Sequence, residues 1–484
     1  MSVIWGIIKA FIKGVLRSRV AIVGTVMATV ILPVLTIFTI LDMQGIVRNP
    51  YFNFLNYVVL GPLFVIGLIL VVIGLFIGKG DEDLGVFTYE YLKEQFSMPG
   101  RFTRVRRLLF LVTGLTLVTM FVVGLVSYTG LRYTDSTSFC GQFCHTVMEP
   151  EYITYRNSPH SQVACVACHF GEGSWSPGTK LSGIRQIFAV ALNTYRRPIE
   201  APATHLRPNR ESCEQCHLPE KFHGDKLYVK DRYLDDEHNT HVQTVLLMKV
   251  GSGGGYRGSQ AHGIHWHVGE RNKVYYRAVD KQRNVISEVR LKKKDGSEIV
   301  YAAGNGKFAG VGEMRVMDCV DCHNRPTHVF LTPSEALDRK MFRGIIPLSL
   351  PFIKKVGLEA LDKTYLSTEE ARIGISRHLR AWYGEHYPDL LEQRTALIER
   401  AAAGVFEAYR ENVFPEMNVG WSTYQSFLGH RDDGGCFRCH DGKHLAPNGT
   451  VITNDCNACH IVLAENEPSP DVVRLLHGQD DDDR

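Results

Sequence analysis

Apolar residues are concentrated in the first 130 positions of the chain, and polar residues dominate the remainder. Within the apolar part, three stretches contain no charged residue: positions 20–41, 58–78 and 108–128. A helix rises about 1.5 Å per residue, so roughly 20 apolar residues cross a hydrocarbon core of about 30 Å. Uncharged runs of this length favour membrane spans over the buried helices of a soluble protein. The pattern therefore predicts three membrane-spanning helices.

Basic residues next to these spans predict their orientation. Segment 1–19 contains four basic residues and no acid, loop 42–57 contains one basic residue, and loop 79–107 contains six. Loops rich in Lys and Arg stay on the cytoplasmic side of a membrane. The first run is too long for a cleaved signal peptide, and no small-residue cleavage site follows it. We therefore expect a cytoplasmic or interfacial N-terminus, a cytoplasmic loop 79–107, and everything after residue 129 on the outer side.

All 12 cysteines occur in six pairs, and a histidine directly follows each pair. Five pairs have the form CxxCH, and the first is a CxxxCH variant. In chain order the motifs are Cys140/Cys144-His145, Cys165/Cys168-His169, Cys213/Cys216-His217, Cys319/Cys322-His323, Cys436/Cys439-His440 and Cys456/Cys459-His460. Two thiols at this spacing can each add to one vinyl group of a porphyrin, and the adjacent imidazole then reaches the iron as proximal ligand. The motifs thus predict six covalently attached c-type haems.

Zinc and disulfides are the competing interpretations of the cysteine pairs. CxxC pairs also bind tetrahedral zinc, and disulfides form readily outside the cytoplasm. Neither requires a histidine directly after every second cysteine. The charge pattern independently places the motifs on the outer side of the membrane, where haem attachment normally occurs in bacteria. Both arguments favour haem.

From Phe139 the chain reads FCGQFCHTVMEPEYITYRNSPHSQVACVACHFGEG. This stretch resembles the NapC/NirT family of membrane-anchored, quinol-oxidising multihaem cytochromes, which includes the NrfH type. The shared features are a first haem motif trailed by Met, an acidic-Pro-aromatic stretch, Ser-x-His before the second motif and a Gly-bearing segment after it. This chain differs from the family pattern in having three spans instead of one and six motifs instead of four.

The resemblance implies that quinol is oxidised beside the first haem and that electrons pass to a partner. The family's quinol-site lysine falls near Lys180, but no carboxylate follows it until Glu200. Glu149, Glu151 and Asp135 are candidate substitute acids, and Arg132 and Gln186 are further candidates for the quinol site.

A six-coordinate haem iron needs a second axial ligand, here called the distal ligand. Of the 20 histidines, 14 remain after the six proximal ones. Met148 lies three residues after His145 and is a candidate for the first iron, and the resemblance implies a distal role for His160. The other distal candidates, chosen for their position near a motif, are His223, His241, His328, His430 and His444.

The stretch between Cys216 and Cys319 contains no haem motif. GSGGG indicates a loop, VYYRAVD and VISEVRLKKKDGSEIVYAA indicate strands, and KDG indicates a hairpin turn. We therefore predict a β-rich insertion over residues 226–318. Its segment HGIHWHVG would place His265 and His267 on one face of a strand, alternating with Trp266. That arrangement suits either a metal pair or one distal haem ligand.

The predicted fold is a multihaem cytochrome c, mainly α-helical and irregular, with three N-terminal transmembrane helices and a small β insertion. Residues 129–225 form the NapC/NirT-like domain with haems 1–3, and residues 319–484 carry haems 4–6. A capping pattern at Ser367 and Glu370 opens a helical segment over 367–409, and the chain ends in an acidic tail.

The predicted function is oxidation of menaquinol or another quinol at the bacterial inner membrane, in anaerobic respiration. A periplasmic cytochrome or a terminal reductase would accept the electrons. A net charge of +3 gives no indication of nucleic-acid binding. One alternative is a non-catalytic electron-transfer subunit that docks other membrane subunits. Another is a terminal haem reductase for a small molecule, although the chain has no CxxCK motif.

Overall fold

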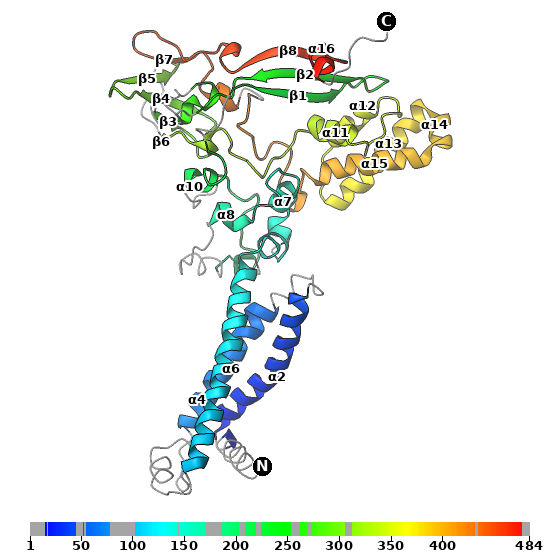
Figure 1. The fold of residues 1–484 in the computed structure, drawn as a ribbon. Coiled ribbons are helices and arrows are strands. Elements are labelled where there is room, and N and C mark those ends of the chain that lie inside the picture. The colour runs from blue at the N-terminus through cyan, green and yellow to red at the C-terminus, as the bar shows by residue number, and fades with distance from the viewer. Residues whose placement is uncertain are drawn as a thin grey trace. The chain divides into compact units, whose positions relative to one another are not determined.

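The computed structural model divides into an N-terminal unit, Met1–His145, and a C-terminal unit, Thr146–Arg484 (Figure 1). It describes residues 15–16, 18–44, 52, 55–77, 102–143, 145–170, 185–186, 188–190, 192–202, 209–218, 224–252, 262–269, 273–304, 312–430 and 434–476.

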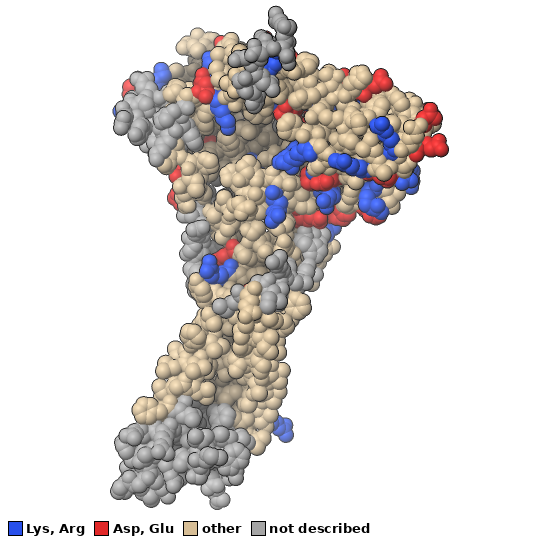
Figure 2. Space-filling view, turned by 45° about the vertical axis from the view of Figure 1, so that its right-hand side comes forward, with Lys and Arg blue, Asp and Glu red and all other residues tan. Residues whose placement is uncertain are grey.

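Three long helices form the N-terminal unit: α2 (Arg19–Met43), α4 (Gly61–Ile77) and α6 (Phe102–Thr134). Two π-helical segments, η1 (Leu55–Leu60) and η2 (Phe139–Phe143), precede α4 and follow α6. All three long helices are long and apolar enough to cross a membrane, which confirms the three predicted spans. The described surface of this unit is almost free of charged side chains in Figure 2. Helix α6 extends beyond the predicted run 108–128 at both ends, because charged and polar residues can continue a helix outside the hydrocarbon.

Small residues allow α2 and α4 to approach closely. A Cβ added to Gly74 would lie 2.3 Å from the Ala21 nitrogen, and one added to Gly24 would lie 2.5 Å from the Gly67 carbonyl oxygen. Lipid chains are as apolar as the helices, so van der Waals contact between backbones drives association inside a membrane. The two additional spans therefore form a tightly packed helical pair.

Helices of the C-terminal unit are mostly short. The α-helices are α7 (His145–Arg156), α8 (Cys165–His169), α10 (Asn209–Cys213), α11 (Pro333–Phe342), α12 (Ile353–Leu361), α13 (Thr368–His386), α14 (Pro388–Gln393), α15 (Thr395–Arg410) and α16 (Asp471–Leu476). The 3-10 turns are η5 (Ile264–Val268), η7 (Cys319–Asp321), η8 (Pro415–Met417), η10 (Gly435–Arg438) and η11 (Cys456–Ala458).

The last five cysteine motifs all lie on or next to a helical turn, namely α8, α10, η7, η10 or η11. Positions i and i+3 share one face of such a turn, so the two thiols of each motif point the same way. The turn continues to the histidine, whose backbone N–H donates to the carbonyl of the first cysteine in His217, His323 and His440, at 2.8–3.0 Å. Local helix geometry thus presents two thiols and one imidazole together.

Two antiparallel sheets hold the C-terminal unit together. One has the order β1-β2-β8, from Lys226–Tyr233, His241–Met248 and His460–Glu467. The other has the order β6-β3-β4-β5-β7, from Met314–Val316, Lys273–Ala278, Ile286–Lys292, Glu298–Ala303 and His444–Leu445. The β structure therefore extends beyond residues 226–318, because β7 and β8 come from the segments around the fifth and sixth motifs. The insertion is joined to the haem-motif segments by backbone hydrogen bonds.

Helices α11–α15 form a module without a cysteine motif, and α13–α15 confirm the predicted helical segment 367–409. Its core contains fully buried Leu337, Ile375 and Val405. The Ser367 hydroxyl accepts from the Glu370 N–H at 3.1 Å, as the capping pattern predicts. Figure 2 shows side chains of both charge signs on the surface of this module.

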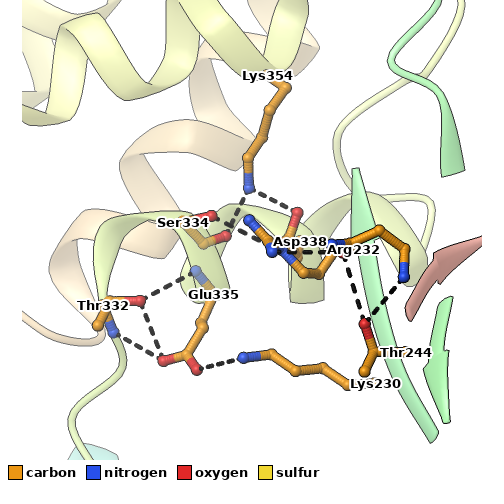
Figure 3. Close-up of polar contacts among 9 residues, drawn as sticks. Lys230, Arg232, Thr244, Thr332, Ser334, Glu335, Asp338 and Lys354 are labelled. Carbon is orange, nitrogen blue, oxygen red and sulfur yellow. Dashed lines mark hydrogen bonds and ion pairs between the residues drawn. The ribbon is translucent and has the colours of Figure 1, made fainter. Parts of the chain in front are cut away.

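A buried ion pair inside this module and polar contacts to strand β1 join the two parts (Figure 3). Lys354 Nζ donates to Asp338 Oδ1 at 2.6 Å, and the same oxygen accepts from the Tyr233 N–H at 3.0 Å. Lys230 Nζ lies 3.4 Å from Glu335 Oε1. A buried charge left without its partner is strongly destabilising. These contacts therefore fix the helical module against the three-stranded sheet.

The close contact of α2 with α4 leads to a prediction for Gly74. We expect Gly74→Leu to destabilise the N-terminal unit by about 1–3 kcal/mol or more, because the new side chain collides with the backbone of Ala21. The measurement is the temperature at which the full chain in detergent loses its monodisperse gel-filtration peak. Gly124→Leu is the matched control, since a Cβ at Gly124 meets nothing within 4 Å. Equal temperatures for both variants would contradict the prediction.

Candidate functional site

Four histidines of the cysteine motifs face a second histidine from a distant part of the chain. The ring-centroid distances are 6.3 Å for His169 with His328, 6.0 Å for His217 with His160, 5.8 Å for His440 with His267, and 6.1 Å for His460 with His430. Each pair joins one motif histidine to one histidine outside any motif.

These distances match two imidazoles on opposite sides of one metal ion. A metal–imidazole bond is about 2.0–2.1 Å and the ring centre lies about 1.1 Å beyond the nitrogen, so the centroids should be about 6.3 Å apart. The angle between the ring planes varies from 24° to 77° among the four pairs. Rings that share a metal axis can rotate freely about it, whereas the distance between them is fixed. The four pairs likewise have similar centroid distances and different angles between the ring planes.

In four of these eight histidines, and also in His265, one ring nitrogen is hydrogen-bonded to a backbone carbonyl. Nδ1 lies 2.6–3.2 Å from a backbone carbonyl oxygen in His160, His265, His267, His328 and His440. A carbonyl can only accept, so these contacts place the proton on Nδ1 and leave the Nε2 lone pair for a metal. Metal-binding histidines typically hold their tautomer and orientation in this way.

Glu151 adds a charge beside one pair. The Nδ1 hydrogen of His328 goes to the Glu151 carbonyl at 2.9 Å, and the Glu151 Oε2 lies 3.1 Å from the same nitrogen. Arg325 approaches the other carboxylate oxygen at 3.7 Å and lies over the Tyr424 ring at 4.0 Å. The carboxylate thus raises the electron density on the imidazole of His328.

Burial lowers the pKa of His169, His265, His267 and His323 below the ordinary value for histidine. The charged imidazolium loses hydration inside the protein, so the neutral form is favoured. Neutral imidazole is also the form that binds a metal.

His323 of the fourth motif has His265 as its main electrostatic neighbour among the histidines, with His217 next. His265 and His267 lie on the 3-10 turn η5, so the prediction that they share one face of a strand is wrong. A 3-10 helix has three residues per turn, and positions i and i+2 therefore point in directions about 120° apart. The turn directs His267 to His440 and His265 toward His323.

Contacts with three other segments fix this turn. His265 donates its backbone N–H to the Val250 carbonyl at 3.1 Å, and Arg210 Nη2 donates to the Val268 carbonyl at 2.7 Å. Trp266 packs on the core of the five-stranded sheet. Gly263 has a φ of +65°, and a Cβ there would lie 2.5 Å from the Lys249 carbonyl oxygen. The crowded backbone and the positive φ both require glycine at this position.

Cysteines of successive motifs lie near one another. Cys168 interacts electrostatically with Cys216, Cys213 is in hydrogen-bond contact with Cys319, and Cys322 and Cys459 both interact with Cys436. Burial raises the pKa of Cys322 and Cys439 to about 12, so these thiols stay neutral. The second to sixth motifs therefore follow one another in space in the same order as along the chain.

Residues inside two motifs connect the fourth motif to the fifth. Asp321 is buried and accepts from the Tyr276 hydroxyl at 2.5 Å and from Arg283 Nη1 at 3.0 Å. Arg438 donates to the Asp321 carbonyl at 2.5 Å and to the Arg283 carbonyl at 2.7 Å. Sequence reasoning missed this contact, although acidic and basic inner residues in adjacent motifs are a visible signal.

The structure contradicts the predicted distal role of His444. It is 1% exposed, with Nδ1 2.9 Å from Asp441 Oδ1 and Nε2 3.2 Å from the Ile286 carbonyl, so both nitrogens are occupied. His241 Nε2 lies 2.8 Å from Asp231, and its ring contacts Tyr233 and Phe342 rather than a motif. His223 lies outside the described residues.

The predicted quinol-site residues are only partly visible. Arg132 lies on α6, with its guanidinium 5.8 Å from the Tyr128 ring centre. Met148 is partly buried and Glu149 exposed on α7, and Gln186 is exposed. Lys180, Cys144 and the side chain of His145 lie outside the described residues.

Comparison with known proteins matches residues 102–206 to the family model described as NapC/NirT cytochrome c family, N-terminal region. The chain is 38% identical over 478 residues to the cytochrome c-type protein ImcH of Geobacter sulfurreducens. That alignment covers 96% of this chain and 93% of the relative. No solved structure matches.

The buried Asp321 leads to a stability prediction. We expect Asp321→Ala to lower the free energy of unfolding by about 3–5 kcal/mol, because it leaves the Arg283 charge and the Tyr276 hydroxyl without their acceptor. Guanidinium unfolding followed by circular dichroism measures the change. Asn457→Ala, at an exposed inner position of the sixth motif, should change it by less than about 0.5 kcal/mol. A similar loss in both variants would show that Asp321 has no special role.

Proposed function

Because the chain belongs to the NapC/NirT family of cytochromes c, we propose that it oxidises quinol at the membrane and passes the electrons through six covalent haems to an acceptor protein. Family membership establishes a membrane-anchored, multihaem c-type cytochrome with covalent haem, which is consistent with electron transfer. The three apolar helices provide the anchor. Quinol as donor, the number of haems and the acceptor are our proposals.

The facing histidine pairs are the observation that supports the electron-transfer function most directly. Each pair offers two imidazoles at the separation that one iron needs, beside two cysteines positioned for thioether bonds. Covalent haem supplies one-electron chemistry between Fe(III) and Fe(II) when bound. Bis-imidazole ligation fills both axial positions and leaves no site for a small substrate. The described motifs are therefore suited to passing electrons rather than to reducing a bound molecule, which argues against the terminal-reductase alternative.

We assign five axial pairs. The distal ligands are His328 for the second haem, His160 for the third, His265 for the fourth, His267 for the fifth and His430 for the sixth. Met148 is retained as the proposed ligand of the first haem, from the family resemblance. In this assignment the distal histidine of each of these five haems lies outside the cysteine motifs.

The order of the motifs supports a linear path. Neighbouring cysteines connect the second motif to the third, the third to the fourth, the fourth to the fifth and the fifth to the sixth. Electrons would enter near the first motif, which directly follows span α6, and leave from the later motifs. We place the N-terminus in the cytoplasm and the C-terminal unit in the periplasm, from the charge pattern.

Lys180, Arg132, Gln186 and Glu149 remain the quinol-site residues proposed from the resemblance. Menaquinol is the proposed donor, and a periplasmic cytochrome or terminal reductase is the proposed acceptor. A role as a non-catalytic subunit of a larger complex would share the same haem path and differ in its electron entry point.

Reduction by quinol tests this function. We expect a reduced menaquinol analogue to reduce the haems of the purified protein in mild detergent, and a quinolone N-oxide inhibitor to prevent it. The measurement is the visible absorption of reduced c-type haem. Full reduction by dithionite without any reduction by quinol would contradict quinol oxidation and place the electron entry point on a partner protein.

The assignment of His265 and His267 to two different haems is also testable. We expect His265→Met and His267→Met each to raise the reduction potential of a single haem, a different one in each variant, because methionine ligation favours the reduced iron. Potentiometric titration followed by electron paramagnetic resonance resolves the individual haems. His386→Met is the control, since His386 stacks on Trp382 in the helical module. The assignment fails if both substitutions shift the same haem or neither shifts one.

A further inference from the structure

A polar cluster lies between the two additional membrane helices, at the ends joined by loop 42–57. Thr39 and Asp42 belong to the last turns of α2, and Asn56 and Tyr57 belong to η1, directly before α4. Asn56 Nδ2 donates to Thr39 Oγ1 at 3.1 Å, and the Tyr57 hydroxyl donates to Asp42 Oδ2 at 2.7 Å. We call these four residues the Asp42–Tyr57 cluster.

Three residues of the cluster are buried, and one acceptor, on Asn56, is unpaired. Thr39, Asn56 and Tyr57 are 5%, 1% and 5% exposed. Within the described part of the chain, the amide oxygen of Asn56 has no hydrogen-bond partner. Burying an unpaired acceptor in an apolar environment costs free energy, and buried unpaired acceptors are rare in native proteins. The amide oxygen is therefore available to a donor that does not belong to the described chain.

Two further features distinguish this position from an ordinary helix contact. The residues Asn56 and Tyr57 lie on a π-helical segment, a rare conformation that is frequently found at functional sites. Asp42 is a partly buried ionisable residue at the end of a membrane span, and ionisable residues in membrane spans often mark proton, ion or substrate pathways. A purely structural contact between α2 and α4 requires neither a π-helical segment nor an ionisable residue, because the glycines of the two helices already pack closely.

Aromatic rings connect the cluster to the first haem motif within the same unit. The Tyr57 ring centre lies 6.0 Å from that of Tyr133 on α6, and Tyr133 lies 5.5 Å from Phe139. Phe139 directly precedes Cys140. Gly130 permits the approach of α6, because a Cβ there would lie 3.2 Å from the Tyr57 Cβ.

We propose that the Asp42–Tyr57 cluster binds the head group of quinol. A quinol is a flat aromatic diol that partitions into the membrane, so it offers two hydroxyl donors and a ring. The cluster offers the Asn56 amide oxygen and the Asp42 carboxylate as acceptors, with the rings of Tyr57 and Tyr133 beside them. This proposal rests on quinol oxidation as the function, and it locates the reaction on residues other than Lys180, Gln186 and Glu149.

The chemistry balances with the first haem as oxidant. One quinol would become quinone by releasing two electrons and two protons, the second proton leaving to solvent water. The electrons would pass one at a time to the covalent haem held by the first motif, and that haem would pass the first electron on to the later haems before it accepted the second. Asp42 accepts a proton from the bound hydroxyl, and Tyr57 holds the carboxylate in place through its own hydroxyl.

Binding of a fluorescent quinolone N-oxide, a quinol analogue whose emission is quenched on binding, tests the site. We expect Asp42→Asn and Asn56→Leu to weaken its binding about tenfold or more, because each removes an acceptor for the ligand hydroxyl. Quinol should reduce the haems more slowly by a similar factor, while dithionite reduction and the number of attached haems stay unchanged. Asp42→Glu should recover part of the loss. Thr36→Val is the control, since Thr36 is on α2 and bonds to its own helix at the Leu32 carbonyl.

The possible results test the quinol-binding cluster separately from the proposed oxidation of quinol. Unchanged analogue binding in Asp42→Asn and Asn56→Leu overturns the site. If Lys180→Ala and Glu149→Gln then abolish reduction by quinol, the function stands and the family site is used. If quinol fails to reduce the wild-type haems, the function fails, whereas the binding measurement still decides whether the cluster recognises the analogue. Loss of attached haem in a variant is excluded by the haem count before binding is compared.

Discussion

The proposed haem ligation requires two imidazoles to face each other across about 6 Å, and much of the C-terminal unit positions such pairs. The cysteine motifs are local and form on single helical turns. Their distal partners come from other parts of the chain, so tertiary structure has to bring them together with an accuracy of a few tenths of an ångström. The four ring pairs at 5.8–6.3 Å show that the polypeptide alone reaches this arrangement.

The residues directly after strand β2 position parts of three proposed haem sites. Lys249 accepts from Ile264 and donates to the Cys459 carbonyl at 2.8 Å, and Val250 holds both the backbone and the ring of His265. This segment therefore positions the distal ligands proposed for the fourth and fifth haems and the backbone of the sixth motif. The pairing of β2 with β8, which begins at His460, has the same effect. The β structure thus connects the segments that carry the proposed haem ligands.

The membrane unit combines close packing with polar side chains that packing does not need. Glycines bring α2 and α4 into backbone contact, and Asp42, Asn56 and Tyr57 lie where that contact ends. The family resemblance covers a single span, so the two additional helices require their own explanation. A quinol site between them would give the additional spans a chemical role beside the first motif.

The sequence by itself determined what depends on neighbouring residues. Runs of apolar residues predicted the three spans, the CxxCH spacing predicted the haem motifs, and the Ser367 capping pattern predicted the helical segment that contains α13–α15. Tertiary structure decided what depends on distant segments. His328 faces His169 rather than its own motif, His444 is occupied by Asp441 and Ile286, and the turn η5 separates His265 from His267. The physical reason is that a cysteine motif is complete within one helical turn, whereas an axial ligand is defined by its distance through space from another imidazole, which sequence separation does not encode.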